Sequence, residues 1–154
     1  MSDALYDFLA QMTRRAAANL ETAYLRLPAD RRRWSPGGAA RTAADMVAEC
    51  AFMNDISGLV EARAFPPGFD AAALRRIKAA LMEDDDRLLG TLRENAERGI
   101  AALRTAPVSD LGAEVKLITL TVTLGQIIAY PYWNMSYHEG QINYIAAQLE
   151  GTGG

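Results

Sequence analysis

The chain has 154 residues, a length typical of one domain that buries most of the surface its unfolded form exposes. Half of the residues are hydrophobic and 23% are charged, which excludes an intrinsically disordered chain. The 16 basic and 19 acidic residues give a net charge of −3, so nucleic-acid binding is not expected. The single cysteine excludes a disulfide framework or a cysteine-rich zinc site.

The N-terminal segment lacks the basic start and apolar run of a secretory signal. No run of about 18 apolar residues occurs, so we expect a cytoplasmic protein without a membrane span. Apolar residues recur at spacings of three and four over residues 5–27, which predicts a first helix that Pro28 ends. The Pro-Gly-Gly sequence within residues 30–40 predicts a loop.

Two further helices are predicted in the middle of the chain. Thr42 is placed to cap the second helix, with Asp45 three residues later, and this helix is expected to run to about Ala62, before a Pro-Pro-Gly break. Asp70 offers an N-cap for a long third helix that ends before Pro107.

The last third of the chain predicts an extended segment and a fourth helix. Residues 114–123 are strand-like in composition, and they form either a short extended pass or a prelude to the helix. The helix is expected from about Tyr132 to Leu149, with Pro131 beginning or kinking it and Gly151 as C-cap. Four such helices predict an all-α four-helix bundle, in one domain over residues 1–150 with a flexible glycine-rich tail over 151–154.

Three polar residues project onto the apolar faces of these helices. Glu49 falls in the apolar stripe of the second helix, and Asn134 and His138, the single histidine, lie together on the inner face of the fourth. Because residues four apart on a helix can direct their side chains to one point, all three can converge between facing helices. Carboxylate, amide oxygen and imidazole can bind a first-row divalent ion. On chemistry alone, a metal-free hydrogen-bonded network is favoured.

Other polar features have simpler interpretations. Asp85 projects onto the apolar face of the third helix but belongs to an acidic run, so a solvent-exposed position is preferred. The run Arg31–Arg33 is interpreted as a solvated loop edge rather than an anion site. Cys50 is interpreted as a small core residue rather than a nucleophile. The aromatic residues within 130–137 are expected to pack in the core or an interface, or else to line a substrate pocket.

The segment from Tyr137 to Ile142 resembles the H-x-G-Q-I signature of the DinB/YfiT-like superfamily. Trp34-Ser35-Pro36 and the stretch from Arg41 to Asp45 resemble that family's tryptophan loop and the start of its second helix. The resemblance spans most of the chain. It implies a four-helix bundle of up-down-down-up topology that is often dimeric. It also implies a divalent metal held by three histidines, one from the second helix and two, four residues apart, from the fourth.

In this chain His138 matches the last of those histidines, whereas Asn134 and Glu49 stand at the other two positions. The resemblance therefore implies a degenerate site in which these three residues bind zinc, nickel or a similar divalent ion. The implied function is that of a metal-dependent hydrolase or a thiol-dependent transferase acting on a small molecule. The alternative is a non-catalytic dimeric protein that binds a ligand or a partner and has lost the metal. The resemblance and the crowded aromatic residues together predict a homodimer.

Overall fold

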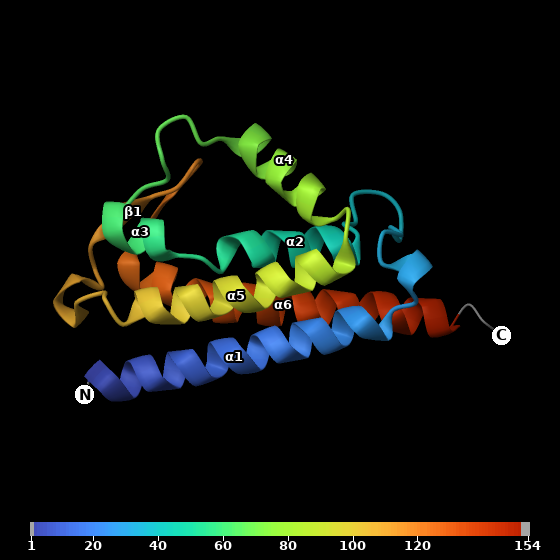
Figure 1. Ribbon diagram of the computed structural model, residues 1–154, viewed down its shortest axis with the longest axis horizontal. Helices are drawn as coiled ribbons and strands as arrows, with labels where there is room; N and C mark the ends of the chain where they lie inside the picture. The colour runs from blue at the N-terminus through green and yellow to red at the C-terminus, as the bar shows by residue number, and fades with distance from the viewer. Residues whose placement is uncertain (1, 152–154) are drawn as a thin grey trace.

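The computed structural model describes residues 2–151, which are mainly α-helical (Figure 1). The elements of this part of the chain are α1 (Ser2–Arg26), η1 (Ala29–Arg31), α2 (Ala43–Met53), α3 (Ser57–Ala62), α4 (Ala71–Leu81), α5 (Asp85–Leu103), η2 (Val108–Asp110), β1 (Glu114–Lys116), β2 (Thr121–Thr123) and α6 (Leu124–Gly151). Of the predicted tail, Gly151 ends α6 and residues 152–154 lie outside the described part. None of the helices described is long and apolar enough to span a membrane.

The helices α1, α2, α5 and α6 lie along the long axis of the molecule (Figure 1). α1 packs along α6, and α5 packs against both α2 and α1. The colour gradient shows that α1 and α6 run in one direction and that α2 and α5 run in the opposite direction. α4 lies outside this group and packs on α2. The predominantly helical fold predicted from the apolar spacing is confirmed.

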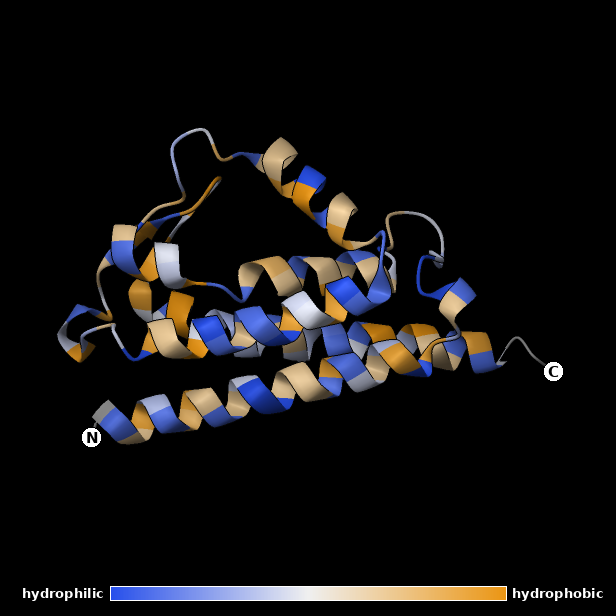
Figure 2. Cartoon of the chain, viewed as in Figure 1, coloured by the Kyte–Doolittle hydropathy of each residue, from blue (hydrophilic) through white to orange (hydrophobic). Residues whose placement is uncertain are grey.

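Helix α1 begins three residues earlier and ends one residue earlier than the helix predicted over residues 5–27. Hydrophobic and hydrophilic patches alternate along it in Figure 2, as expected for a helix with one buried face. Leu20 and Tyr24 are fully buried on that face, and Leu27 is buried just beyond the helix. Each buried leucine of this kind stabilises the fold by about 1.5–3 kcal/mol.

The prediction of one helix over residues 42–62 is wrong, because α2 and α3 are separate helices. Asn54 ends α2, and the carboxylate of Asp55 accepts hydrogen bonds from the amide and the hydroxyl of Ser57, which starts a new turn. Gly99 of α5 packs against the backbone carbonyl of Asn54 at this break, so α5 approaches the chain closely here.

The prediction of one long third helix is also wrong, because α4 and α5 are separate. Asp70 caps α4 as predicted, by accepting a hydrogen bond from the amide of Ala73. Asp84 then caps α5 by accepting from the amide of Arg87. α4 thus ends with Met82 as its C-cap, a side-chain cap inside the acidic run starts α5, and the chain changes direction between the two helices.

Residues 114–123 contain the antiparallel pair β1 and β2, in which Val115 stands opposite Val122. The extended interpretation of this segment is confirmed, and the segment leads directly into α6. α6 begins directly after β2, earlier than predicted, because Thr123 and Gln126 cap it reciprocally through side-chain and backbone hydrogen bonds. Pro131 lies inside the helix instead of starting it.

Candidate functional site

The structure brings Glu49 of α2 and His138 of α6 together. Oε1 of Glu49 lies 3.4 Å from Nε2 of His138. The side chain of His138 is 4% exposed and that of Glu49 is 20% exposed, so the pair lies at the edge of the interior. A buried histidine and a carboxylate therefore face each other between two helices that are far apart in sequence.

The second oxygen of Glu49 is held by an arginine. Nη1 of Arg41 lies 2.8 Å from Oε2 of Glu49, and Nε of Arg41 lies 2.5 Å from Oδ2 of Asp45. Lys78 of α4 pairs with the other oxygen of Asp45 at 2.7 Å. Two cations and two carboxylates thus form one network along the side of α2, and their charges balance.

His138 has a partner at each ring nitrogen. Nδ1 lies 2.6 Å from Oε1 of Gln141, one helical turn further along α6. Because the ionised carboxylate of Glu49 only accepts hydrogen bonds, Nε2 must carry a proton to bond with it. The imidazole is therefore fixed in orientation from both sides.

Asn134 lies on the same buried side of α6 but has a different partner. Its amide nitrogen lies 3.5 Å from Sγ of Cys50. Cys50 is fully buried, as predicted for a core residue. Burial and the negative charge of Glu49 raise the pKa of this thiol well above its usual range, so the thiol stays protonated and unreactive.

The electrostatics of the network keep Glu49 ionised. Burial alone raises the pKa of Glu49, but the hydrogen bond with His138 and the positive charge of Arg41 outweigh this effect and lower the pKa to about 2. Burial and the charge of Glu49 raise the pKa of Tyr130 to about 12, so its phenol stays protonated at neutral pH.

The metal ion that the family resemblance implies can be tested against these residues. Two ligands about 2.1 Å from a tetrahedral ion stand about 3.4 Å apart, which matches the spacing of Glu49 and His138. However, the guanidinium of Arg41 already compensates Glu49, and the amide nitrogen of Asn134 is directed at Cys50. Within residues 2–151, no group of three or more His, Cys, Asp or Glu side chains could hold a metal. The donor set is a poor fit for a divalent ion.

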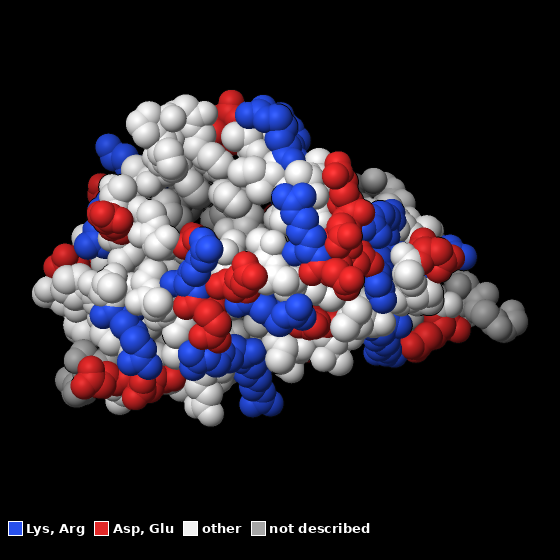
Figure 3. Space-filling model, viewed as in Figure 1, with Lys and Arg blue, Asp and Glu red and all other residues white. Residues whose placement is uncertain are grey.

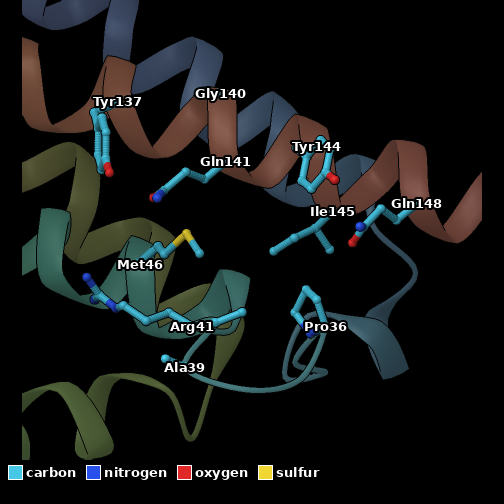
Figure 4. A pocket seen from close by; sticks show the side chains of 11 residues that line it. Pro36, Ala39, Arg41, Met46, Tyr137, Gly140, Gln141, Tyr144, Ile145 and Gln148 are labelled. Atoms are coloured by element: carbon cyan, nitrogen blue, oxygen red, sulfur yellow. The ribbon is translucent and has the colours of Figure 1, made fainter.

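A cleft of about 510 Å³ opens beside the network, between α6, the start of α2 and the loop before it (Figure 4). Tyr137, Gln141 and Tyr144 of α6 line one side, and Met46 and Arg41 face them from the other. Gln141 and Arg41 are the partners of His138 and Glu49. The network therefore reaches the cleft through these two side chains.

The loop that forms one wall of the cleft is anchored by Asp85. Its carboxylate accepts hydrogen bonds from the hydroxyl of Tyr24 at 2.8 Å, from Arg32 at 2.7 Å and from Arg33 at 2.9 Å. Asp85 is 22% exposed and ion-paired, so its predicted solvent-exposed position is wrong. The interpretation as a solvated loop edge is wrong for Arg32, which is 14% exposed, and is confirmed for Arg31 and Arg33, which are exposed. The acidic run and the arginine run instead pair with each other across the fold.

Sequence reasoning missed the role of Arg41. The spacing of four between Arg41, Asp45 and Glu49 is visible in the sequence, but Arg41 lies before the first residue of α2, so a helical projection does not include it. Gln141 is not among the site residues predicted from the sequence, whereas the structure makes it the partner of His138.

Comparisons of the chain with protein-family models, with curated proteins and with solved structures gave no match. The resemblance to the DinB/YfiT-like superfamily therefore stays a prediction based on short motifs. The function has to be argued from the cleft and the charged network beside it.

Proposed function

We propose that this chain is a small-molecule-binding protein that works without a metal and uses the cleft between α2, α6 and the loop before α2. The observation that carries the proposal is that both oxygens of Glu49 are paired beside the cleft, one with Arg41 and one with His138. A carboxylate compensated in this way needs no metal ion, and the network gives the cleft a fixed polar end.

The lining of the cleft favours a flat, uncharged organic molecule. Tyr137 and Tyr144 offer aromatic rings, Met46 offers an apolar contact, and Gln141 offers an amide. The charge of Arg41 is already balanced by two carboxylates. The polar end therefore supplies hydrogen bonds without attracting either sign of charge.

Benzamide, benzoate and benzylamine test this preference, because they share a ring and differ in charge. In ligand-observed NMR titrations we expect benzamide to bind more tightly than either ion. Gln141→Leu should weaken benzamide binding, because the cleft loses its amide. The control Gln11→Leu changes an exposed glutamine of α1, away from the cleft, and should leave binding unchanged. Tighter binding of an ion, or benzamide binding that Gln141→Leu does not weaken, would contradict the proposal.

The absence of a metal requirement is tested by calorimetric titration of tag-free protein with Zn²⁺ and Ni²⁺. We expect no saturable binding by the wild type. The double variant Glu49→His with Asn134→His places three imidazoles at the converging positions and should bind either ion, which makes it a positive control. Stoichiometric binding by the wild type that His138→Ala abolishes would overturn the metal-free proposal. That result would support the metal-dependent hydrolase or thiol-dependent transferase.

We further infer that α1, α2, α5 and α6 form a four-helix bundle of up-down-down-up topology. The directions of the four helices in Figure 1 support this inference, as do the close packing of α1 with α6 and of α2 with α5. α3, α4 and the β1–β2 pair are then additions at one side of the bundle.

A further inference from the structure

One side of α6 is accessible over most of its length, and its residues follow a regular spacing. From Tyr130 the positions advance by three and four alternately, through Trp133, Tyr137, Gly140 and Tyr144 to Ala147. All six are at the surface: Tyr130 is half-buried and the other five are exposed. We call these six residues the α6 seam. Alternation of three and four is the spacing by which one helix packs lengthwise on another.

Three aromatic side chains of the seam are more than half exposed to solvent. Trp133 is 55% exposed, Tyr137 is 53% exposed and Tyr144 is 64% exposed. The rings of Trp133 and Tyr137 stack at a centroid distance of 5.6 Å, and Tyr130 continues the row at 5.7 Å from Trp133. A continuous exposed row of large rings is typical of a surface that another protein covers.

The seam contains no charged residue. The acidic side chains of α6 are Glu139 and Glu150, which lie on the opposite side of the helix from Tyr137, and Glu150 pairs with Arg26 of α1. By contrast, side chains of both charges cover α1 and α5 on the face shown in Figure 3. In a symmetric dimer a surface meets the same surface of the second copy, so like charges would repel each other; a surface without charges avoids this repulsion.

We propose that the α6 seam pairs with the same seam of a second copy of this chain, with the two helices antiparallel about a two-fold axis. In one register Tyr137 stands opposite Gly140 of the partner subunit and Tyr130 stands opposite the partner's Ala147. The same register sets Trp133 opposite the partner's Tyr144. Two of the three kinds of contact thus pair a large side chain with a small one, and the third pairs two aromatic rings. A parallel pair would instead set Tyr137 against the partner's Tyr137 and leave a gap at Gly140.

The pairing also completes the cleft. Tyr137, Gly140 and Tyr144 line the cleft as well as the seam. The partner's Trp133, opposite Tyr144, stands beside the open side of the cleft and adds an aromatic wall to it. This consequence rests on the proposed function, whereas the pairing of the seams rests on α6 alone.

Sedimentation and light scattering test the pairing, with Gly140→Leu as the main variant. A Cβ atom at Gly140 meets nothing within 4 Å in its own subunit, so the fold accommodates a side chain there, but a leucine fills the space that the partner's Tyr137 occupies. We expect a wild-type dimer and a dimer at least about tenfold weaker for Gly140→Leu. The control Gly90→Leu, on an open part of α5, should remain dimeric. A wild-type monomer at high micromolar concentration, or a Gly140→Leu dimer as tight as the wild type, would overturn the proposal.

Disulfide cross-linking tests the register. Tyr130→Cys and Ala147→Cys are made as separate proteins, and Cys50 is retained because it is buried. After mixing and oxidation, the antiparallel register predicts cross-links between the two proteins and almost none within either alone. Cross-links of Ala147→Cys with itself would indicate the parallel pair and would refute the antiparallel register. Benzamide affinity of the wild type then separates the two proposals, because Gly140 itself lines the cleft: a wild-type monomer that still binds benzamide removes the pairing and the role of the partner's Trp133 and leaves the ligand proposal standing.

Discussion

The carboxylate of Glu49 should leave a measurable pH signature in the stability of the protein. Its pKa falls from an ordinary 4.5 to about 2 on folding, so the stabilisation is fully present above pH 4.5 and is lost as the pH falls towards 2. At neutral pH this effect amounts to at most about 3 kcal/mol. In urea unfolding with chelator present, the stability gap between the wild type and Glu49→Gln should therefore narrow steadily below pH 4.5.

The control for this measurement is Glu94→Gln, which changes an exposed glutamate of α5. Its stability should differ little from that of the wild type at any pH, because an exposed carboxylate gains little on folding. A gap for Glu49→Gln that stays constant from pH 7 to pH 3 would mean that Glu49 is not held by Arg41 and His138 in solution.

Asp85 should matter more than its neighbours in the acidic run. Burial raises the pKa of Asp85, but hydrogen bonds from Arg32 and Tyr24 outweigh burial and lower it, so the carboxylate is ionised at neutral pH. Asp85→Ala leaves the Tyr24 hydroxyl and the Arg32 guanidinium without this acceptor and should cost about 2 kcal/mol in the free energy of unfolding. Hydrogen exchange should also speed up over residues 32–41, because the loop loses its anchor.

Asp86→Ala is the matched substitution, since Asp86 is the next residue and is exposed. It should cost only a few tenths of a kcal/mol, through the weaker interaction of the α5 N-terminus with negative charge. Equal effects of the two substitutions on stability and on hydrogen exchange would show that the loop does not depend on Asp85.

At the level of the helices, the close approach of α5 to the break between α2 and α3 depends on Gly99. A Cβ atom at this position would collide with the backbone carbonyl of Asn54, which cannot move without displacing the end of α2. Gly99→Ala should therefore destabilise the fold by about 1–3 kcal/mol in urea unfolding. Gly90→Ala, in the same helix but in open space, should instead stabilise it by about 0.5–1 kcal/mol. Stabilisation by both substitutions would show that α5 can move away from the break.

The sequence predicted which segments are helical better than where the helices are interrupted. Apolar spacing of three and four identifies a buried face, and this spacing continues past both Asn54 and Asp84, where the backbone turns. The interruptions depend on single side chains that satisfy backbone amides, and such residues are common on helix surfaces as well. The helical predictions therefore merged α2 with α3 and α4 with α5.

The same reasoning found one half of the candidate site and missed the other. Glu49 and His138 could be found because a polar residue on an apolar face is conspicuous in a helical projection. Arg41 precedes the first turn of α2, so no helical projection includes it, although its guanidinium lies 2.8 Å from Glu49 in the structure. The partner of a buried charge depends on tertiary structure, which periodicity does not encode.

In the molecule as a whole, α6 supplies both the buried histidine of the network and the exposed seam. The stability of each subunit against unfolding should therefore depend on whether two seams pair in a dimer. If two seams pair, folding is coupled to dimer formation, and a hundredfold rise in protein concentration adds about 1.4 kcal/mol of stability per subunit. For a chain of this length, Tm should then rise by about 3–5 °C. Gly140→Leu should show a smaller dependence of Tm on concentration, because it weakens the pairing while a Cβ atom at this position meets nothing in its own subunit. Gly90→Leu should keep the concentration dependence of the wild type. A wild-type Tm that is the same at both concentrations would mean that the exposed aromatic residues of α6 face solvent in the native state.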